Sequence, residues 1–344
     1  MSIRVAVFTG SKNISSRRFR VFQYIECLYR QNIEIIEHYS AFGSWPPATI
    51  AYRPFWLVLT LLDRIIPIIR SYRCDITFFQ RELVSTLLTF ECFTKRPRIL
   101  DVDDAIWLQN KRANKNFLKL VQNCNGIICG NQFIYDNLKN YNSNCIIIPT
   151  SVDTNRFIPS MNSTKTKKKI IGWSGLSSGF KYLYDIEAEL FKILSENDNV
   201  VLRIVSDSEP RFKTIPDNKI EFIKWTPENE VSTIQEMTIG IMPIDNSEWS
   251  KGKCSYKMLL YMSCSVPVVV SYFGMNIEVL SKAKIGFGAS YKTDWSKYLQ
   301  ILLNDRILAM EMGINGRGVI EGHYSIEKNS IVLSNFIKSN LSRT

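Results

Sequence analysis

The sequence predicts an α/β protein built on two doubly wound parallel sheets. Short apolar runs alternate with longer amphipathic stretches along the chain, the pattern stops at a polar, lysine-rich break at 160–169, and it then starts again. Alternating strands and helices are typical of parallel β-α-β units. A chain of 344 residues has room for two such domains.

The elements can be placed in order along both predicted domains. In the first, 1–160, we expect strands at 3–9, 33–38, 75–79, 98–102, 126–129 and 144–148, and helices at 17–30, 82–93, 114–122 and 132–140. In the second, 168–325, we expect strands at 170–173, 200–205, 219–223, 238–242 and 267–271. Ligands of open parallel sheets bind beyond the carboxyl ends of the strands.

The composition is that of a folded protein with reduced thiols. Hydrophobic residues make up 45% and charged residues 22% of the chain. The eight cysteines are scattered and only two histidines are present, so buried thiols are expected in place of a disulfide or zinc framework. We find no secretory signal, and no apolar run approaches the roughly 20 residues of a transmembrane helix. A cytoplasmic location is expected.

The formal net charge of +11 indicates a polyanionic partner or a charged surface. Nucleic acid, anionic lipid and a phosphorylated substrate all fit this charge. Since the sequence contains no helix-turn-helix, ribonucleoprotein motif or paired zinc ligands, we expect no nucleic-acid partner.

Residues 251–271 follow the order of an anion-binding element: a loop, a helix, Pro267 and a buried strand. The first turn of a helix carries unpaired N–H groups and the positive end of the dipole. Lys253 and Lys257 add two ammonium groups, so a nucleotide diphosphate is the natural ligand.

This stretch resembles the donor-site motif of retaining glycosyltransferases of family four. The residues that match in order are Pro243, Asp245, Trp249, Gly252, Lys253, Cys254, Lys257, Tyr261, Met262, Pro267, Val268 and Val269. The segment 148–157 resembles the one that ends the first domain in this family. The resemblance implies a GT-B fold, with two Rossmann-like domains facing each other across a cleft and the last helix, about 326–341, packed back on the first domain.

The resemblance also implies an activity of the EC 2.4 class. The expected enzyme is retaining and metal-independent, uses a nucleotide-diphosphate sugar as co-substrate without a cofactor, and acts on a lipid-linked or oligosaccharide acceptor in surface-polysaccharide synthesis. The family commonly has two glutamates separated by seven residues, and Gly252 and Leu260 stand at these positions here. A catalytically inactive relative that binds nucleotide or glycan is the alternative.

Candidate donor-binding residues follow the predicted strands of the second domain. Small residues after the first strand let N–H groups approach a phosphate, although a plain turn is an alternative. Trp225 is expected to stack on the base or to lie in the core, and Glu278 to bind ribose or simply to favour its helix N-terminus, with the Asn276 and Ile277 amides facing phosphate. The full set is Gly175, Ser177, Ser178, Lys181, Trp225, Asp245, Trp249, Lys253, Tyr256, Lys257, Asn276 and Glu278.

The candidate catalytic residues are Asp103, Asp104 and Lys253. The two aspartates follow a strand in the region where many relatives carry a catalytic-site histidine. A carboxylate there can orient the attacking hydroxyl or stabilise positive charge on the donor sugar. Binding of a metal or capping of a helix are the alternatives, and the resemblance implies no metal.

Two basic segments lie in the first predicted domain. The first predicted helix begins with arginines, which its dipole disfavours, so Ser11, Arg17 and Arg18 are candidates for binding an anionic acceptor such as a lipid diphosphate; a solvated basic face is the alternative. Residues 55–73 combine apolar bulk with Arg53, Arg64, Arg70 and Arg73. They predict peripheral binding to the anionic inner face of a membrane, or else a core helix with arginines at the surface.

Overall fold

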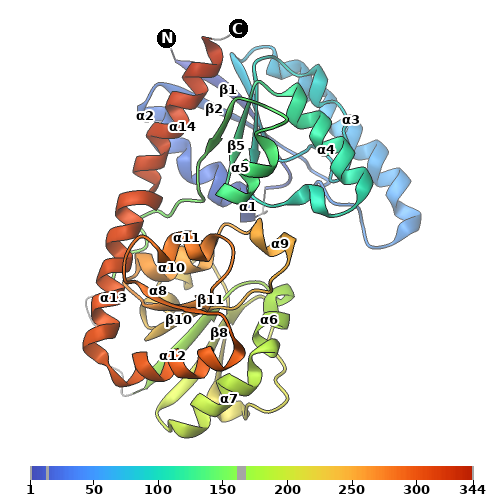
Figure 1. Ribbon diagram of the computed structural model, residues 1–344. Helices are drawn as coiled ribbons and strands as arrows, with labels where there is room; N and C mark the ends of the chain where they lie inside the picture. Colours follow the sequence, from blue (N-terminus) through green and yellow to red (C-terminus); the bar gives the residue numbers. More distant parts are fainter. Residues whose placement is uncertain (1, 13–14, 161–167, 343–344) are drawn as a thin grey trace. The chain divides into compact units, whose positions relative to one another are not determined.

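The computed structural model describes residues 2–12, 15–160 and 168–342. The chain divides into two compact units (Figure 1): unit 1 is Met1–Ser151, Lys251–Cys254 and Ile326–Thr344, and unit 2 is Val152–Ser250 and Ser255–Ser325. Most of the predicted break, 161–167, lies outside the described residues. The segment Lys251–Cys254 belongs to unit 1 although its neighbours in the chain belong to unit 2.

Unit 1 is built on a six-stranded parallel sheet in the order β2-β1-β3-β4-β5-β6. The strands are β1 (Ile3–Thr9), β2 (Ile33–Tyr39), β3 (Ile76–Gln80), β4 (Arg98–Val102), β5 (Gly126–Cys129) and β6 (Cys145–Ile147). The strands predicted for the first domain are confirmed to within one residue at each end.

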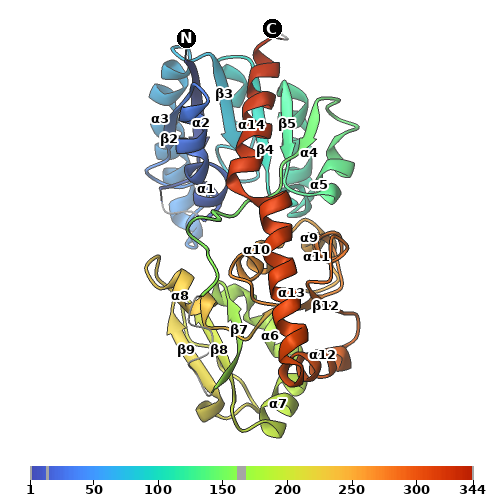
Figure 2. The ribbon, with the colours of Figure 1, turned by 90° about the vertical axis from the view of Figure 1, so that its left-hand side faces the viewer.

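Helices cover both faces of this sheet because strand side chains alternate between the faces. Val5 and Val7 face α2 (Ile25–Arg30) and α14 (Ile326–Leu341), which lies over the sheet in Figure 2. Ala6 and Phe8 face the other core, which includes residues of α3 (Arg53–Ser71), α4 (Lys111–Asn123) and α5 (Gln132–Leu138).

The predicted helix at 17–30 is interrupted. It consists of α1 (Ser15–Arg20), a 3₁₀ turn at Phe22–Tyr24 and α2. Val21 leaves the helical region with φ −127° and ψ −64°. On either side of the break, side chains reach into the interior: Arg20 donates to the Ile148 carbonyl at 2.9 Å and the Tyr24 hydroxyl to Ser151 Oγ at 2.8 Å.

The predicted helix at 82–93 is wrong. Val84 and Leu87 form an isolated antiparallel bridge, and only Glu91–Phe93 form a 3₁₀ turn. The buried Glu91 carboxylate accepts the N–H groups of Leu83 at 3.0 Å and Thr89 at 2.6 Å. Bonds from backbone to side chain compete with helical ones, and here they fold the segment into a loop.

Unit 2 is built on a second six-stranded parallel sheet in the order β12-β11-β10-β7-β8-β9. The strands are β7 (Lys169–Ser174), β8 (Val200–Ser206), β9 (Ile220–Lys224), β10 (Ile239–Met242), β11 (Val268–Ser271) and β12 (Gly286–Ala289). The prediction missed β12, whose two glycines weaken the strand pattern. A Cβ at Gly286 would lie 2.1 Å from the Val268 carbonyl oxygen, so β12 approaches β11 where no side chain fits.

One face of the second sheet packs through Trp173 and Leu202 on a core that includes residues of α6 (Phe180–Asp185), α7 (Glu187–Glu196), α12 (Lys292–Asn304) and α13 (Arg306–Val319). Gly240 of β10 lies against Tyr261 of α10 (Tyr256–Ser263). The short helices α8 (Glu230–Gln235), α9 (Glu248–Lys251) and α11 (Met275–Leu280) complete the unit. No helix in the described part of the chain is long and apolar enough to cross a membrane.

A buried ion pair joins α1 to the carboxyl half of β4. Arg20 Nε lies 2.9 Å from Asp101 Oδ2, its Nη2 also donates to this carboxylate, and both side chains are almost fully buried. Moving a charged group out of water costs free energy, and each member of this pair offsets that cost for the other.

We therefore expect Asp101→Asn to destabilise unit 1. The substitution keeps the size of the side chain but leaves the Arg20 guanidinium buried without a counter-charge, which costs roughly 3–5 kcal/mol. Urea unfolding followed by tryptophan fluorescence measures the loss.

Glu26→Gln is the matched control, because the Glu26–Arg30 pair has side chains 77% and 71% exposed and should leave stability nearly unchanged. Similar stability of Asp101→Asn and the wild-type chain would show that the buried pair is not needed.

Candidate functional site

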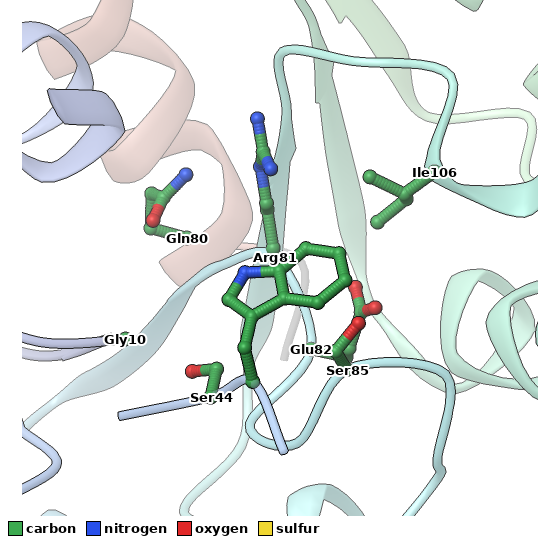
Figure 3. Close-up of a pocket in the computed structure, with 8 residues that line it drawn as sticks. Gly10, Ser44, Gln80, Arg81, Glu82, Ser85 and Ile106 are labelled. Carbon is green, nitrogen blue, oxygen red and sulfur yellow. The ribbon is translucent and has the colours of Figure 1, made fainter. Parts of the chain in front are cut away.

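The first group of candidate residues lies at the carboxyl ends of β3 and β4 in unit 1. Arg81 Nε lies 2.7 Å from Asp103 Oδ1, and its Nη2 lies 2.6 Å from Asp104 Oδ2. Arg81 takes a left-handed conformation with φ 65°. One guanidinium thus bridges both predicted catalytic carboxylates. Arg81 (Figure 3) was not among the predicted site residues, although a charged residue two positions past the predicted strand 75–79 was a signal for it.

Lys253 joins this cluster. Its Nζ lies 2.9 Å from Asp104 Oδ1. The Asn131 side-chain amide donates to the carbonyls of Lys251 and Lys253, both at 3.1 Å, while its Oδ1 caps α5. The Cys254 thiol donates to the Asp103 carbonyl at 3.1 Å. The three predicted catalytic residues therefore lie together, and Asn131, which the sequence analysis did not single out, holds the lysine loop in place.

The charges in the cluster determine what its carboxylates can do. Burial acts to raise the pKa of Asp103, but the Arg81 guanidinium outweighs it, and the pKa falls below its usual value. A carboxylate that resists protonation is a poor general base. It can still orient a hydroxyl or stabilise positive charge. No group of His, Cys, Asp or Glu side chains within 2–12, 15–160 and 168–342 is arranged to hold a metal ion.

Gly252 packs against the loop that follows the two aspartates. A Cβ at this position would lie 2.5 Å from the Ala105 Cβ and 2.7 Å from the Ala105 amide nitrogen. Leu260, the other position where the family commonly has glutamate, is 5% exposed in the core of unit 2. Position 252 therefore has no room for a larger side chain, and the side chain at position 260 is buried.

The arginines of α1 have partners within the protein. Arg17 Nη2 lies 2.6 Å from Glu37 Oε2, and its Nη1 donates to the Lys12 carbonyl at 3.1 Å. The Arg18 guanidinium lies 4.9 Å from the ring centroid of Phe19. Carboxylates of the chain, Glu37 and Asp101, thus offset much of the basic charge of this helix. Ser11 follows β1 and is half-buried.

The second group of candidates lies at the carboxyl ends of the strands of unit 2. The sheet order places β8 on one side of β7 and β10 on the other. The connections that follow β7 therefore lead first to one edge of the sheet and later to the other, which makes a topological switch point between β7 and β10. Ligands of doubly wound sheets bind at such a switch point. The loop after β7 holds Gly175, and the loop after β10 holds Asp245. Lys181 lies in α6, which follows the first of these loops, and its Nζ is 4.0 Å from Asp245 Oδ2.

Lys257 lies next to the loop after β7. Its Nζ is 4.1 Å from the ring centroid of Trp173, which is fully buried. A Cβ at Gly175 would lie 2.4 Å from the same Nζ, so the glycine makes room for the lysine. Lys257 therefore contacts the small-residue loop, whereas Lys253 contacts Asp104. The two lysines that the sequence assigned to one anion have different protein partners.

Asp207, which follows β8, binds the first serine of this loop. Its carboxylate accepts the Ser177 N–H at 2.6 Å and the Ser177 hydroxyl at 2.9 Å. Hydrogen bonds from Ser177 and Ser206 outweigh the effect of partial burial and lower the pKa of Asp207. A group that binds one anionic carboxylate has donors suited to a phosphate. Ser178 is exposed.

Asp245 is held by hydroxyl groups of its own loop. It accepts hydrogen bonds from Ser247 at 2.5 Å and from Ser250. Burial acts to raise its pKa, and the two hydroxyl groups and the Lys181 charge outweigh it, so the pKa lies below its usual value. Asp245 is thus an ionised, exposed hydrogen-bond acceptor, as binding of a sugar hydroxyl requires. Trp249 and Tyr256 are half-buried.

The remaining donor candidates differ in exposure. Trp225 follows β9 and is 36% exposed, so the interpretation as a core indole is wrong. Glu278 is exposed. Asn276 is fully buried and its side chain links Ser255 Oγ at 2.7 Å to the Ser271 carbonyl at 2.9 Å.

The backbone of this segment also differs from expectation. The Asn276 N–H donates to the Phe273 carbonyl and the Ile277 N–H to the Gly274 carbonyl, both at 3.2 Å. These two amides were expected to face a phosphate, and in this structure they stabilise the turn that starts α11.

Helix α3 of unit 1 (Figure 1) exposes apolar side chains and buries an arginine. Its apolar residues Phe55, Leu62 and Ile69 are 57–67% exposed, whereas Arg64 is 1% exposed. Arg64 donates to the carbonyls of Thr9 at 2.8 Å and His38 at 3.3 Å. The interpretation as a core helix with surface arginines holds in part, because Ile68 packs in the core and Arg53, Arg70 and Arg73 are exposed. It fails for Arg64, which faces the sheet, and for the apolar side chains that face outward.

Comparisons with known proteins support the fold. The sequence matches no protein-family model and no curated protein. By structure, however, the chain has the GT-B fold, and the predicted fold class is confirmed. Identities as low as those below establish only the fold.

Three similar structures span almost the whole chain. Sucrose-phosphate synthase from Thermosynechococcus elongatus has a TM-score of 0.73 at 11% identity and covers 99% of this chain and 100% of its own. HepE from Anabaena, solved with UDP-glucose, has a TM-score of 0.72 at 11% identity over 98% and 100%. WaaG, a glycosyltransferase involved in lipopolysaccharide biosynthesis, has a TM-score of 0.66 at 11% identity over 96% and 99%.

The packing of Gly252 leads to a stability prediction. Gly252→Ala should destabilise the chain by roughly 1–3 kcal/mol, because the added methyl group overlaps backbone atoms of Ala105. Chemical unfolding measures the change.

Gly318→Ala is the control, since a Cβ at this exposed position of α13 meets no atom within 4 Å and alanine is the better helix former by up to about 1 kcal/mol. If Gly252→Ala were as stable as the control, the close approach to Ala105 would be wrong.

Proposed function

We propose that the protein is a retaining glycosyltransferase that moves a sugar from a nucleotide-diphosphate sugar to a lipid-linked glycan in surface-polysaccharide synthesis. The observation that supports it most is the position of the motif residues: Gly175, Asp245 and Lys257 follow or adjoin the central strands of unit 2, where a doubly wound sheet binds its ligand. The GT-B fold supports the same function.

The donor is proposed to bind at the strand ends of unit 2. Lys257 and the loop 175–178 supply the charge and the donors for a diphosphate, and the exposed Trp225 offers an aromatic face to the base. Asp245 accepts hydrogen bonds from the sugar. HepE, solved with UDP-glucose, makes UDP the first nucleotide to test.

Asp103 and Asp104 are proposed to orient the acceptor hydroxyl and to stabilise positive charge on the donor sugar. Arg81 keeps Asp103 ionised, so this carboxylate is suited to an electrostatic role rather than to taking a proton. In the same-face displacement expected of a retaining enzyme of this fold, the leaving phosphate helps to take the proton. Lys253 adds a positive charge next to Asp104, with its Nζ 2.9 Å from Asp104 Oδ1.

A second candidate function is a protein that binds nucleotide without transferring sugar. The close packing of Gly252 favours it, because the position has no room for the glutamate common in the family. Nucleotide binding without release of nucleoside diphosphate from any sugar donor and lipid-linked acceptor would select this function.

We expect Lys257→Ala to weaken binding of UDP or of the preferred nucleoside diphosphate. Losing one charge-assisted hydrogen bond costs about 1.5–3 kcal/mol, a factor of roughly 10–150 in Kd. Isothermal titration with a panel of nucleoside diphosphates measures it.

Lys192→Ala, which removes an exposed lysine of α7, should leave Kd unchanged. Lys253→Ala should lower the rate of sugar transfer, measured as release of nucleoside diphosphate from the sugar donor in the presence of acceptor. Unaltered nucleotide binding by Lys257→Ala would remove this lysine from the proposed donor site.

We also propose that α3 binds the anionic inner surface of a membrane. The exposed Phe55, Leu62 and Ile69 supply apolar surface. Arg64 is buried, but Arg53, Arg70 and Arg73 are exposed and supply positive charge. Each basic residue near an anionic leaflet contributes about 1 kcal/mol. Such a position would keep the enzyme next to a lipid-linked acceptor.

The triple variant Phe55→Ser, Leu62→Ser, Ile69→Ser should bind vesicles of phosphatidylglycerol at least tenfold more weakly than the wild-type chain, because it removes the apolar part of the contact. Vesicle co-sedimentation measures binding, and high salt should weaken it further.

The control is Ile307→Ser with Ile314→Ser, which removes apolar side chains of α13 that are 82% and 64% exposed. Equal loss in the control and in the α3 variant, or no loss in either, would contradict a specific role for α3.

A further inference from the structure

Helix α4 of unit 1 exposes a row of positive charges that the proposed site does not use. Four side chains, called the basic face of α4 below, are exposed on this helix: Lys111, Arg112, Lys115 and Lys119. Lys111, Lys115 and Lys119 are spaced by four residues, so they lie one after another along the same side of the helix. At a rise of about 1.5 Å per residue, the row is about 12 Å long.

The core fixes the direction in which α4 presents this face. Phe117 and Leu120 are buried against the sheet of unit 1. The Trp107 ring stacks on Phe117 with 5.6 Å between the ring centroids. The Asn116 side chain donates to the Thr86 carbonyl at 2.9 Å and joins the helix to the loop after β3. The basic face therefore points away from the sheet.

Acidic residues are missing from the sequence around the basic face. Residues 105–135 contain no Asp or Glu. The acidic residues that flank this stretch have other partners: Asp104 binds Arg81, and Asp136 binds Lys139 at 2.5 Å. Among the residues that the structure describes, no ion pair joins the basic face to a carboxylate. Positive charge without counter-charges attracts an anionic partner from outside the chain.

The loop at 82–93, which packs on α4, does not neutralise the basic face either. Its Glu91 is buried and accepts the Leu83 N–H at 3.0 Å. Its Glu82 accepts the Thr86 N–H at 3.1 Å. Both carboxylates thus stabilise the loop itself.

The row of charges begins at the edge of the sheet where the predicted catalytic residues lie. Asp103 and Asp104 follow β4, a 3₁₀ turn at Ile106–Leu108 comes next, and α4 starts at Lys111. Because a helix between two parallel strands runs back along the sheet, Lys119 lies farther from that edge than Lys111 does. A linear ligand whose end reaches the two aspartates can therefore continue along the basic face.

The chemistry of this face distinguishes among anionic partners. Helices that bind a membrane surface insert apolar side chains, but no large apolar side chain between residues 109 and 140 is exposed in the described chain, in contrast to α3. The same stretch exposes no aromatic ring on which the bases of a single-stranded nucleic acid could stack. Lysines are flexible point charges, and a row of them suits a chain that carries one carboxylate in each repeating unit.

We infer that the basic face of α4 binds a linear acidic glycan, one with a uronic acid in its repeating unit. The sugars behind the reacting end lie along Lys111, Lys115 and Lys119, and their carboxylates pair with the ammonium groups. The inference rests on the proposed transfer to a glycan and adds the chemical class of that glycan.

A variant of the full-length chain without these charges tests the inference. Glutamine replaces each cation, because it is also a good helix former and the four side chains are exposed. The basic-face variant carries Lys111→Gln, Arg112→Gln, Lys115→Gln and Lys119→Gln. The control variant loses the same charge from exposed positions of other helices through Lys192→Gln, Lys297→Gln, Arg306→Gln and Lys338→Gln. Circular dichroism and thermal unfolding check that both variants are folded.

The probes are oligogalacturonides from the dimer to the octamer, without nucleotide, and the uncharged methyl ester of the octamer. Isothermal titration measures binding. We expect the octamer to bind the wild-type chain and the control variant alike, and to bind the basic-face variant about tenfold or more weakly, since several weak exposed ion pairs are lost together. Affinity should rise with oligomer length in the wild-type chain only, and the methyl ester should not bind.

Salt provides a second readout of the same contact. Raising the ionic strength from about 0.1 M to about 1 M shortens the Debye length from about 10 Å to about 3 Å, so it should abolish most of the difference between the wild-type chain and the basic-face variant.

Several results would overturn the inference. They are no binding of the octamer by the wild-type chain, equal binding by the basic-face and control variants, and equal binding of the octamer and its methyl ester. Single-stranded DNA that binds the basic face as tightly as the octamer would identify a nucleic-acid surface instead. Loss of binding to phosphatidylglycerol vesicles in the basic-face variant, with octamer binding retained, would identify a membrane surface.

The test separates this inference from the proposed function. Octamer binding that depends on the basic face supports the inference even if no nucleotide binds and no sugar is transferred. Conversely, if sugar is transferred to a uronic-acid acceptor and the basic-face variant keeps the wild-type KM for that acceptor, the proposed function holds and the inference about α4 is wrong.

Discussion

Three positive and three negative side chains meet at the carboxyl ends of β3 and β4, and the rest of unit 1 is arranged around them. Arg20 is paired with Asp101, Arg81 with Asp103 and Asp104, and Lys253 with Asp104. Charges taken out of water are tolerated only when each has a counter-charge and its remaining donors are bonded. The balance is reached by residues from four distant parts of the sequence, and it fixes the end of α1, the loop after β3 and the segment Lys251–Cys254 together. A change in one member therefore affects both the fold and the candidate catalytic groups.

The same principle explains why carboxylates of the chain occupy places where an external anion was expected. Glu37 binds Arg17, and Asp207 binds both the N–H and the hydroxyl of Ser177. A hydrogen-bond donor that could bind an anion lowers the stability of the unliganded protein less when a side chain of the chain accepts its hydrogen bond. A nucleotide that binds at the Ser177 loop would have to compete with Asp207, so the phosphate contribution of Lys257 becomes more important to the proposed function.

Helix α3 and the strand ends of unit 1 show opposite departures from the usual distribution of polar and apolar residues. On α3, apolar side chains are exposed while Arg64 is buried against the carbonyls at the ends of β1 and β2. Burial lowers the pKa of Arg64 to about 10, which leaves it protonated at neutral pH. At the strand ends of unit 1, Ser44, Gln80, Glu82 and Ser85 (Figure 3) each bury a polar side-chain atom that has no partner among the described residues. An exposed apolar face and buried polar atoms without partners both cost stability in the isolated chain.

The sequence by itself determined the parts of this protein that depend on local pattern. Alternating apolar runs predicted the strands of the first sheet and β7 to β11 of the second. A spaced set of residues from Pro243 to Val269 pointed, through the family resemblance, to the GT-B fold and to the packing of α14. Tertiary structure alone decided the loop at 82–93, the pairing of β12, the direction in which α3 presents its apolar face and the partners of Asp103 and Lys253. These depend on groups far apart in the chain, such as the Glu91 carboxylate that holds the loop and Asn131 that holds Lys251 and Lys253. Periodicity reports which side of an element is apolar, whereas only the folded chain shows what that side meets.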